Sequence, residues 1–201
     1  MKTIIIKSPS GNIQSIFSAL RRIGVNAQLT DNFEEILSSD RIIFPGVGEA
    51  KLTMRYLREK SLDLLIPKLK QPFLGICLGL QLLCFHSEEN NTDCLGIFDL
   101  EIKKFKNINK SNMKIPKIGW NTIYQLEGLL FKGIPEESSQ YFVHSYFAPI
   151  CEYTIAKTDY IYTYSSALQK NNFHAVQFHP EKSGIYGHKI LENFIQLSNF
   201  L

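Results

Sequence analysis

Residues 72–83 read Pro-Phe-Leu-Gly-Ile-Cys-Leu-Gly-Leu-Gln-Leu-Leu and place one cysteine where two patterns meet. The short apolar run before Cys77 is typical of a buried parallel strand, and the run that begins at Leu78 is typical of a helix. Gly75 and Gly79 flank the cysteine, and a sharp strand-to-helix turn needs glycine because a side chain would collide with neighbouring strands. The segment predicts a thiol exposed at a helix N-terminus, where the thiolate is favoured. A buried structural cysteine between two packing glycines is the alternative.

A histidine and a glutamate far along the chain, in Gln177-Phe178-His179-Pro180-Glu181-Lys182, supply what a nucleophilic thiol needs. A base must take the proton of the thiol and return it to the leaving group, and histidine is the usual choice. In an extended segment residues i and i+2 face the same side, so the Glu181 carboxylate can orient the His179 ring. Alone, His179 would be interpreted as a capping or surface histidine. Together with the predicted strand-to-helix turn at Cys77, which has the pattern of a nucleophile elbow, the segment predicts a Cys77–His179–Glu181 triad.

A glycine-rich loop can supply the backbone donors that acyl transfer requires. The run Arg41–Phe44 has the pattern of another buried strand and leads into Pro45-Gly46-Val47-Gly48. We expect an oxyanion hole formed by the N–H of Leu78, directly after the nucleophile, and the N–H of Val47. An ordinary strand-to-helix turn is the alternative, since glycine pairs of this kind are common.

Together these three segments resemble the class I, or triad-type, glutamine amidotransferases. Glutaminase domains of that family carry a Pro-Gly-Val-Gly-like loop, a Gly-x-Cys-x-Gly elbow and a His-Pro-Glu triad. The resemblance covers essentially the whole chain, and within the family it is greatest to the HisH-type glutaminase subunits of imidazole glycerol phosphate synthase. This narrower resemblance rests on residues 115–121 (Ile-Pro-Lys-Ile-Gly-Trp-Asn), 141–146 (Tyr-Phe-Val-His-Ser-Tyr) and 177–184.

The resemblance implies that L-glutamine is hydrolysed to glutamate and ammonia through a thioester on Cys77, without a metal or cofactor. Ammonia would pass to a HisF-type (β/α)8-barrel cyclase, the partner in a heterodimer of histidine biosynthesis. His144 is expected to be structural. The residues implied to hold the substrate are Gly48, Gln81, Ser145 and Tyr146, and those implied to contact the partner are Trp120 and Lys182.

The length of the chain and a basic stretch also predict a partner. The glutaminase segments span residues 45–181 and leave no room for a domain that uses ammonia, so an acceptor chain is implied. Residues 102–126 contain no Asp or Glu and hold the only tryptophan, Trp120, beside Lys103, Lys104, Lys106, Lys110, Lys114 and Lys117. An aromatic anchor with a basic rim predicts a docking patch. A solvated lysine-rich loop next to a core tryptophan is the alternative.

The first loop departs from the family pattern, which opens with Asp-Tyr-Gly-x-Gly-Asn. Here Lys7-Ser8-Pro9-Ser10-Gly11-Asn12 keeps only Gly11 and Asn12. This leaves open a paralogue that supplies ammonia to another acceptor, for example a sugar amidotransferase. Two rival functions are a stand-alone cysteine hydrolase or peptidase and a non-enzymatic binding subunit, of which the intact triad positions disfavour the second.

Composition indicates a compact enzyme. At 201 residues and 44% hydrophobic content, the chain can bury one core, and we expect one glutamine amidotransferase domain over residues 1–201. No run has the length of a membrane span, and the start lacks a signal-peptide layout. The four cysteines (Cys77, Cys84, Cys94 and Cys151) lack Cys-x-x-Cys spacing, which favours a reducing cytoplasm over structural zinc. A net charge of +3 does not indicate nucleic acid.

The alternation of strand and helix patterns predicts an α/β fold with an open, mostly parallel central sheet flanked by helices, a flavodoxin-like three-layer arrangement. A run of short strands after Asp93 predicts an added antiparallel portion. The expected strands are 3–7, 26–29, 41–44, 73–76, 97–103, 121–124, 141–147, 153–156, 160–164 and 173–178. The expected helices are 12–23, a short one after Asp31-Asn32, 49–70, 78–85 and 187–201, and the expected polar loops are 90–93 and 106–111.

Overall fold

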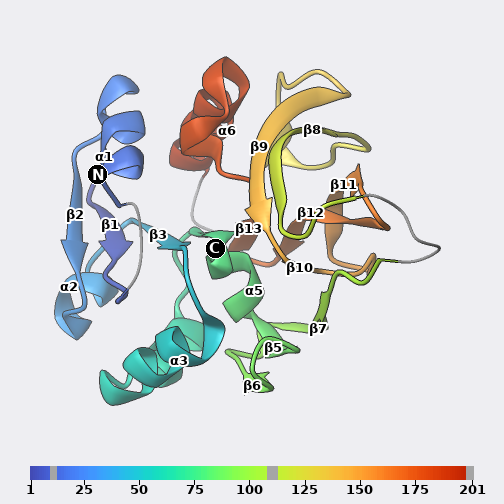
Figure 1. The fold of residues 1–201 in the computed structure, drawn as a ribbon. Coiled ribbons are helices and arrows are strands. Elements are labelled where there is room, and N and C mark those ends of the chain that lie inside the picture. The colour runs from blue at the N-terminus through green and yellow to red at the C-terminus, as the bar shows by residue number, and fades with distance from the viewer. Residues whose placement is uncertain (10–12, 108–112, 198–201) are drawn as a thin grey trace.

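The computed structural model describes residues 1–9, 13–107 and 113–197 and is built around a seven-stranded sheet (Figure 1). The strands of that sheet lie in the order β11-β12-β13-β4-β3-β1-β2. They are β1 (Thr3–Ile6), β2 (Ala27–Thr30), β3 (Arg41–Gly46), β4 (Phe73–Cys77), β11 (Thr154–Asp159), β12 (Thr163–Lys170) and β13 (Phe173–Val176). The helices are α1 (Ile13–Arg22), α2 (Phe33–Leu37), α3 (Ala50–Glu59), α4 (Leu62–Leu65), α5 (Leu78–Leu83) and α6 (Gly184–Gln196), with 3-10 turns η1 (Ile66–Lys68), η2 (Leu129–Phe131) and η3 (Pro180–Lys182).

The central strands β1, β3, β4 and β13 pair in parallel and are buried along their whole length, which is why apolar residues predominate in them. β2 closes one edge in parallel, and β12 and β11 extend the other edge in antiparallel pairing. In parallel strands the carboxyl ends meet at one edge of the sheet. The ends of β3 and β4 lie side by side there, with Gly46 in register with Cys77.

Helices cover both faces of the sheet, as Figure 1 shows with α1 and α6 on one side and α3 on the other. One apolar cluster joins α3, α4 and α5 to Ile4, Phe44 and Phe73 of the sheet. The second joins α1 and α6 to Ile5, Leu74 and neighbouring side chains. This three-layer arrangement, with a mostly parallel sheet and an antiparallel portion, confirms the predicted fold class.

Two smaller sheets, in which all but one of the strand pairs are antiparallel, lie beside the carboxyl edge of the large sheet. A four-stranded sheet has the order β10-β7-β5-β6, with β5 (Cys84–Ser87), β6 (Thr92–Asp93), β7 (Phe98–Lys104) and β10 (Tyr146–Phe147). A separate ribbon pairs β8 (Lys117–Ile123) with β9 (Ser138–His144). Both pieces bring loops to the end of β4, where Cys77 lies.

Several element predictions were wrong because long-range pairing decides where these segments end. α5 stops at Leu83, and Cys84 begins a strand whose neighbours, residues 95–97, donate to the carbonyl groups of residues 82–84. The expected strand 160–164 is mostly turn, and the strand itself is β12. The expected long helix 49–70 is divided at Ser61, which has a φ of 56°. The expected loop 90–93 holds two strand residues in β6.

Other differences are shifts of element boundaries. β8 begins at Lys117, before the expected start, and α6 begins at Gly184 and ends at Gln196. Parts of four predictions lie outside the described residues: positions 10–12 of the first loop, position 12 of the first helix, positions 108–111 of the polar loop with Lys110, and positions 198–201 of the last helix.

Candidate active site

Cys77 lies at the tight turn that the sequence predicts: it is the last residue of β4, directly before Leu78, the first residue of α5. It is the N-cap of that helix, with a φ of 55° and a ψ of −108°. A cysteine with positive φ is uncommon, and backbone strain of this kind persists where the surrounding structure imposes it, often at reactive sites. The strained turn of a nucleophile elbow accounts for this conformation.

Gly75, which flanks the cysteine, and Gly46, at the end of β3, are required by close contacts around the turn. A Cβ atom on Gly75 would lie 2.9 Å from the carbonyl group of Gly79, and one on Gly46 would lie 2.8 Å from Cβ of Leu78. Real Cβ atoms do not approach other heavy atoms so closely. Glycine at these positions therefore lets β3, β4 and α5 converge at the cysteine, as expected from the elbow pattern.

His179 and Glu181 form a buried pair that faces the cysteine. Nδ1 of His179 is 2.8 Å from Oε1 of Glu181, and both side chains are 4% exposed. The segment differs from the expected extended one: His179 is extended, but residues 180–182 form the short turn η3. The i, i+2 pairing survives because the turn starts at Pro180, directly after the histidine.

The charges of this group favour a reactive sulfur. Burial alone would lower the pKa of His179, but the adjacent Cys77, which hydrogen-bonds to the ring, and then Glu181 raise that pKa to about 10. The ring is therefore protonated at neutral pH, and an imidazolium beside the sulfur stabilises a thiolate. Gln177 adds a further donor, since its Nε2 lies 3.7 Å from Sγ of Cys77.

A cavity of about 260 Å³ opens at the sulfur. This volume lies just below the range of roughly 300–1,000 Å³ that holds drug-sized ligands, so it suits a single amino acid. The structure brings together most of the predicted site residues here, while Glu181 stands behind His179. The lining consists of Val47, Gly48, Cys77, Leu78, Gln81, Glu89, Pro116, Val143, His144, Ser145, Tyr146, His179 and Lys182.

Gln81 and His144 organise one wall of the cavity. Gln81 is 4% exposed, and its amide hydrogens are directed to the carbonyl oxygen of Tyr146 at 3.2 Å and to Oε1 of Gln177 at 3.1 Å. Oε1 is therefore the atom that Gln81 can offer to a ligand. Nδ1 of His144 donates to the same carbonyl oxygen at 2.7 Å, and Nε2 accepts from the hydroxyl of Tyr164 at 3.2 Å. Burial lowers the pKa of His144 to about 4, so the ring stays neutral and shapes the wall.

Sequence reasoning missed Glu89, Gln177 and Val143 as site residues. Glu89 is the one carboxylate among the lining residues, and it reaches the cavity because β5 and β6 form a hairpin, which no local pattern indicated. Gln177 stands two residues before His179, in the segment 177–184 that carries part of the family resemblance, and these were the available signals. The carbonyl oxygen of Val143 lies 3.6 Å from Sγ of Cys77 through the placement of β9. In the described part of the chain, no group of His, Cys, Asp and Glu side chains could hold a metal ion.

Trp120 lies outside the core. Its side chain is 55% exposed, on the same face of β8 as Ile118, which is 60% exposed. The Trp120 ring packs edge-to-face on Tyr141 at 5.9 Å between ring centroids, and Nζ of Lys182 lies 5.9 Å from the Tyr141 centroid. The core alternative for Trp120 is therefore wrong. The exposed face continues to the mouth of the cavity through Lys182, which is one of its lining residues.

Comparisons with known proteins agree with this geometry. The family model for glutamine amidotransferase class-I matches residues 4–197. Imidazole glycerol phosphate synthase subunit HisH of Bacteroides fragilis (strain YCH46) is 52% identical over 197 residues, covering 98% of this chain and 100% of that protein. The HisH subunit of Escherichia coli (strain K12) is 41% identical over 199 residues, covering 98% and 100%.

A solved glutamine amidotransferase structure superposes with a TM-score of 0.73 at 17% identity, covering 96% of this chain and 97% of the other, which shows a shared fold. No helix in residues 1–9, 13–107 or 113–197 has the length and apolar character needed to cross a membrane. The elbow, the His-Pro-Glu segment and the match over nearly the whole chain lead to one conclusion: the chain belongs to the class I glutamine amidotransferase family.

Proposed function

We propose that this chain is the glutaminase subunit of an imidazole glycerol phosphate synthase. It hydrolyses L-glutamine and delivers ammonia to a HisF-type cyclase in histidine biosynthesis. The observation that carries the activity is the Cys77 elbow facing the His179–Glu181 pair at a cavity of amino-acid size. The names of the HisH relatives support this choice of ammonia acceptor.

In the first half of the reaction, the sulfur of Cys77 attacks the side-chain carbonyl carbon of glutamine. The C–S bond forms and the carbonyl oxygen becomes an oxyanion. Collapse of this intermediate breaks the C–N bond, and the imidazolium of His179 gives its proton to the departing amine. Ammonia leaves, and a thioester remains on Cys77. Glu181 holds the His179 ring in orientation throughout.

In the second half, the now neutral His179 removes a proton from water, which adds to the thioester carbonyl. The C–S bond breaks, the sulfur departs as a thiolate beside the restored imidazolium, and glutamate forms. The carboxylic acid releases its remaining proton. The net change is glutamine plus water to glutamate plus ammonia.

Both oxyanions need donors, and we assign these to the N–H groups of Val47 and Leu78. Both residues line the cavity next to Cys77, at the adjoining ends of β3 and β4. Gly46 and Gly48 flank Val47, and Gly48 has a φ of 114°. Glycines on both sides allow the Val47 peptide to rotate at low steric cost, which makes this donor the adjustable part of the hole.

The remaining lining residues suit the amino-acid end of glutamine. Glu89 supplies a carboxylate for the α-ammonium group, and Oε1 of Gln81 can accept from a substrate N–H. Ser145, in the bend between β9 and β10, and Tyr146, at the start of β10, border the same cavity, and Gly48 borders it as well. In this arrangement the side-chain amide of glutamine lies at Cys77, and these residues hold its amino-acid end.

We propose that the cyclase docks on the exposed face of β8 and β9. Ile118, Trp120 and Tyr141 provide apolar surface there, with Lys182 beside them at the mouth of the cavity. An aromatic anchor next to a cationic rim fits an interface centre. This position would cover the site and keep ammonia from solvent.

We further propose that residues 1–201 work as one glutamine amidotransferase domain and that the reaction takes place in the cytoplasm. Two observations support this. The large sheet and both smaller sheets contribute to the same cavity, and all four cysteines are free thiols.

The test is synthesis of imidazole glycerol phosphate by the chain, a HisF-type cyclase and the phosphoribosylated carboxamide ribonucleotide. We expect glutamine to support synthesis only when the chain is present, whereas ammonium salts support the cyclase alone. Glutamine hydrolysis without synthesis would refute the histidine assignment and favour the paralogue. Full hydrolysis by the chain alone would instead favour a stand-alone cysteine hydrolase.

A further inference from the structure

The tip of the β5–β6 hairpin, defined here as residues 88–91, lies between two walls of the cavity. Oε2 of Glu88 accepts from the N–H of Lys104 at 2.7 Å, on the strand β7 that pairs with Tyr146. Oε2 of Glu89 accepts from the N–H of Ala50 at 2.8 Å, at the start of α3. The carboxylate of Glu88 therefore attaches the tip to β7, and the carboxylate of Glu89 attaches it to the start of α3.

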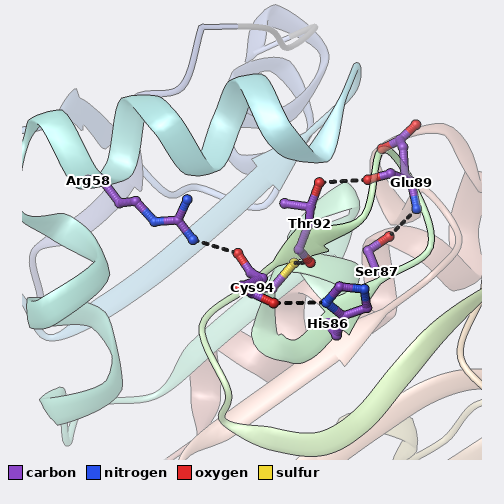
Figure 2. Close-up of polar contacts among 7 residues, drawn as sticks. Arg58, His86, Ser87, Glu89, Thr92 and Cys94 are labelled. Atoms are coloured by element: carbon purple, nitrogen blue, oxygen red, sulfur yellow. Dashed lines mark hydrogen bonds and ion pairs between the residues drawn. The ribbon is translucent and has the colours of Figure 1, made fainter.

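The backbone of Glu89 is held within the hairpin by two buried hydroxyl groups. The N–H of Glu89 donates to Oγ of Ser87 at 3.1 Å, and Oγ1 of Thr92 donates to the carbonyl oxygen of Glu89 at 2.6 Å. Figure 2 shows these two contacts on either side of Glu89. Ser87 is 0% exposed and Thr92 is 3% exposed. The position of the Glu89 carboxylate is therefore imposed by its surroundings.

A second contact joins the tip to α3 next to the first. Nδ2 of Asn90 donates to Oε1 of Glu49, which is the N-cap of α3. Asn90 has a φ of 51°, a left-handed conformation that asparagine tolerates. Residues 89 and 90 of the hairpin thus pair with residues 50 and 49 of the helix start. Val47, the adjustable oxyanion donor, stands only three residues before Ala50.

We propose that Asn90 and Glu49 are positioning residues that couple binding of the substrate α-amino group at Glu89 to the position of the Val47 loop. This inference rests on the proposed glutaminase function. The Glu89 carboxylate accepts from the N–H of Ala50 at the start of α3 and also lines the cavity. A cation that binds this carboxylate in the cavity therefore changes its contact with the segment that carries Val47. The Asn90–Glu49 contact keeps hairpin and helix start together, so that this effect reaches the loop.

The charge at Glu89 fits such a role. Burial raises the pKa of Glu89, the hydrogen bond from the N–H of Ala50 opposes this rise, and the nearby charge of Glu49 adds a smaller rise. The charge of the ionised Glu89 carboxylate is therefore not fully compensated, so this group can bind a cation. A carboxylate has about four acceptor positions, so accepting from Ala50 leaves room for an ammonium group.

The test compares glutamine with 4-carbamoylbutanoate, which is glutamine without its α-amino group. Steady-state hydrolysis is measured with the chain and its cyclase for the wild type, Asn90→Asp and Asn90→Gly. Asp places like charge opposite Glu49, and Gly removes the amide while it keeps the left-handed backbone. For glutamine we expect kcat to fall about tenfold in both variants, the effect of losing one hydrogen bond to a charged group. For 4-carbamoylbutanoate we expect kcat to change less than about twofold, because this compound lacks the α-amino group that would bind Glu89.

Asn91→Asp is the matched control, because Asn91 is the next residue, is exposed and is also left-handed, with a φ of 48°. It should behave as the wild type. A rise in KM alone for glutamine would overturn the coupling and leave Glu89 as a simple binding group. Equal losses for both substrates would overturn it in favour of general damage to the site. If the wild type hydrolyses no glutamine, the proposed function itself fails.

Discussion

A Cβ atom on Gly79 would lie 2.0 Å from the carbonyl oxygen of Phe44, so the first turn of α5 packs directly against β3. The contacted atom belongs to the backbone of a central strand and cannot move aside. The nucleophile turn therefore depends on glycine at position 79 for packing as well as for chain direction.

We predict that Gly79→Ala destabilises the chain by more than about 3 kcal/mol, beyond the usual cost of overpacking, and abolishes glutaminase activity in any soluble fraction. Gly24→Ala is the control, because Gly24 has a φ of +77° but no atom within 4 Å of the new Cβ. It should cost only about 1–2 kcal/mol. Urea unfolding measures both, and equal losses would contradict the packing argument.

The cysteines should differ sharply in reactivity. We predict that an alkylating glutamine analogue labels Cys77 and spares the other three. Burial raises the pKa of Cys84 well above its usual range and that of Cys94 to about 12. Mass spectrometry of digested protein identifies the labelled site. Labelling spread evenly over the cysteines would contradict the assignment of the nucleophile.

Removing the sulfur should separate glutamine hydrolysis by this chain from synthesis by the cyclase. We predict that Cys77→Ala lowers glutamine hydrolysis by several orders of magnitude, because no thioester can form. Synthesis by the cyclase from ammonium salts should continue beside this variant. Loss of the ammonium-dependent reaction as well would show that the variant harms the partner and not the chemistry alone.

The interface assignment makes a prediction about Trp120. Trp120→Ala should weaken cyclase binding by about 2 kcal/mol or more, as hot-spot residues do. The melting temperature of the isolated chain should hardly change, because the ring is 55% exposed. Calorimetric titration measures the binding. Leu64→Ala, at a 63% exposed position on α4, is the control and should leave affinity unchanged. Equal affinity of both variants would refute the anchor.

Acid stability should reflect the buried His174, which is 1% exposed and whose ring nitrogens have no hydrogen-bond partner among the described residues. Burial lowers its pKa from 6.5 to about 4 in the folded chain. Between these two values the unfolded chain binds a proton that the folded chain does not. The free energy of unfolding should therefore fall as the pH falls through this window, by up to about 1.4 kcal/mol per pH unit for this group.

His174→Leu removes the titration and should flatten the pH dependence in urea unfolding between pH 6.5 and 4. Some slope should remain, because burial lowers the pKa of His144 to about 4 as well. Identical slopes for the wild type and the variant would contradict this account.

Local sequence was sufficient to predict the turn at Cys77, the His179–Glu181 contact and the parallel half of the fold. The Cys77 elbow and the His179–Glu181 pair are each encoded within a few neighbouring residues, and apolar residues predominate in the buried strands. What failed depended on distant partners. Cys84 became a strand residue through pairing with Phe98 of β7, and Glu89 entered the cavity through the β5–β6 hairpin. Neither arrangement leaves a periodic signal in the sequence.

The segment Gly46-Val47-Gly48, where β3 ends, leads to the last prediction, that the isolated chain is nearly inactive. Because glycines flank Val47, its N–H can point toward the oxyanion or away from it. One missing oxyanion donor costs roughly 10²–10³ in rate, enough to make wasteful hydrolysis negligible. Binding of the cyclase and its nucleotide would favour the competent orientation, which requires only a few kcal/mol of differential binding. Glutamine turnover measured alone, with cyclase, and with cyclase plus nucleotide should rise at each step. A rigid loop with a permanently formed hole would instead give full turnover in the isolated chain, and that result would rule out the gate.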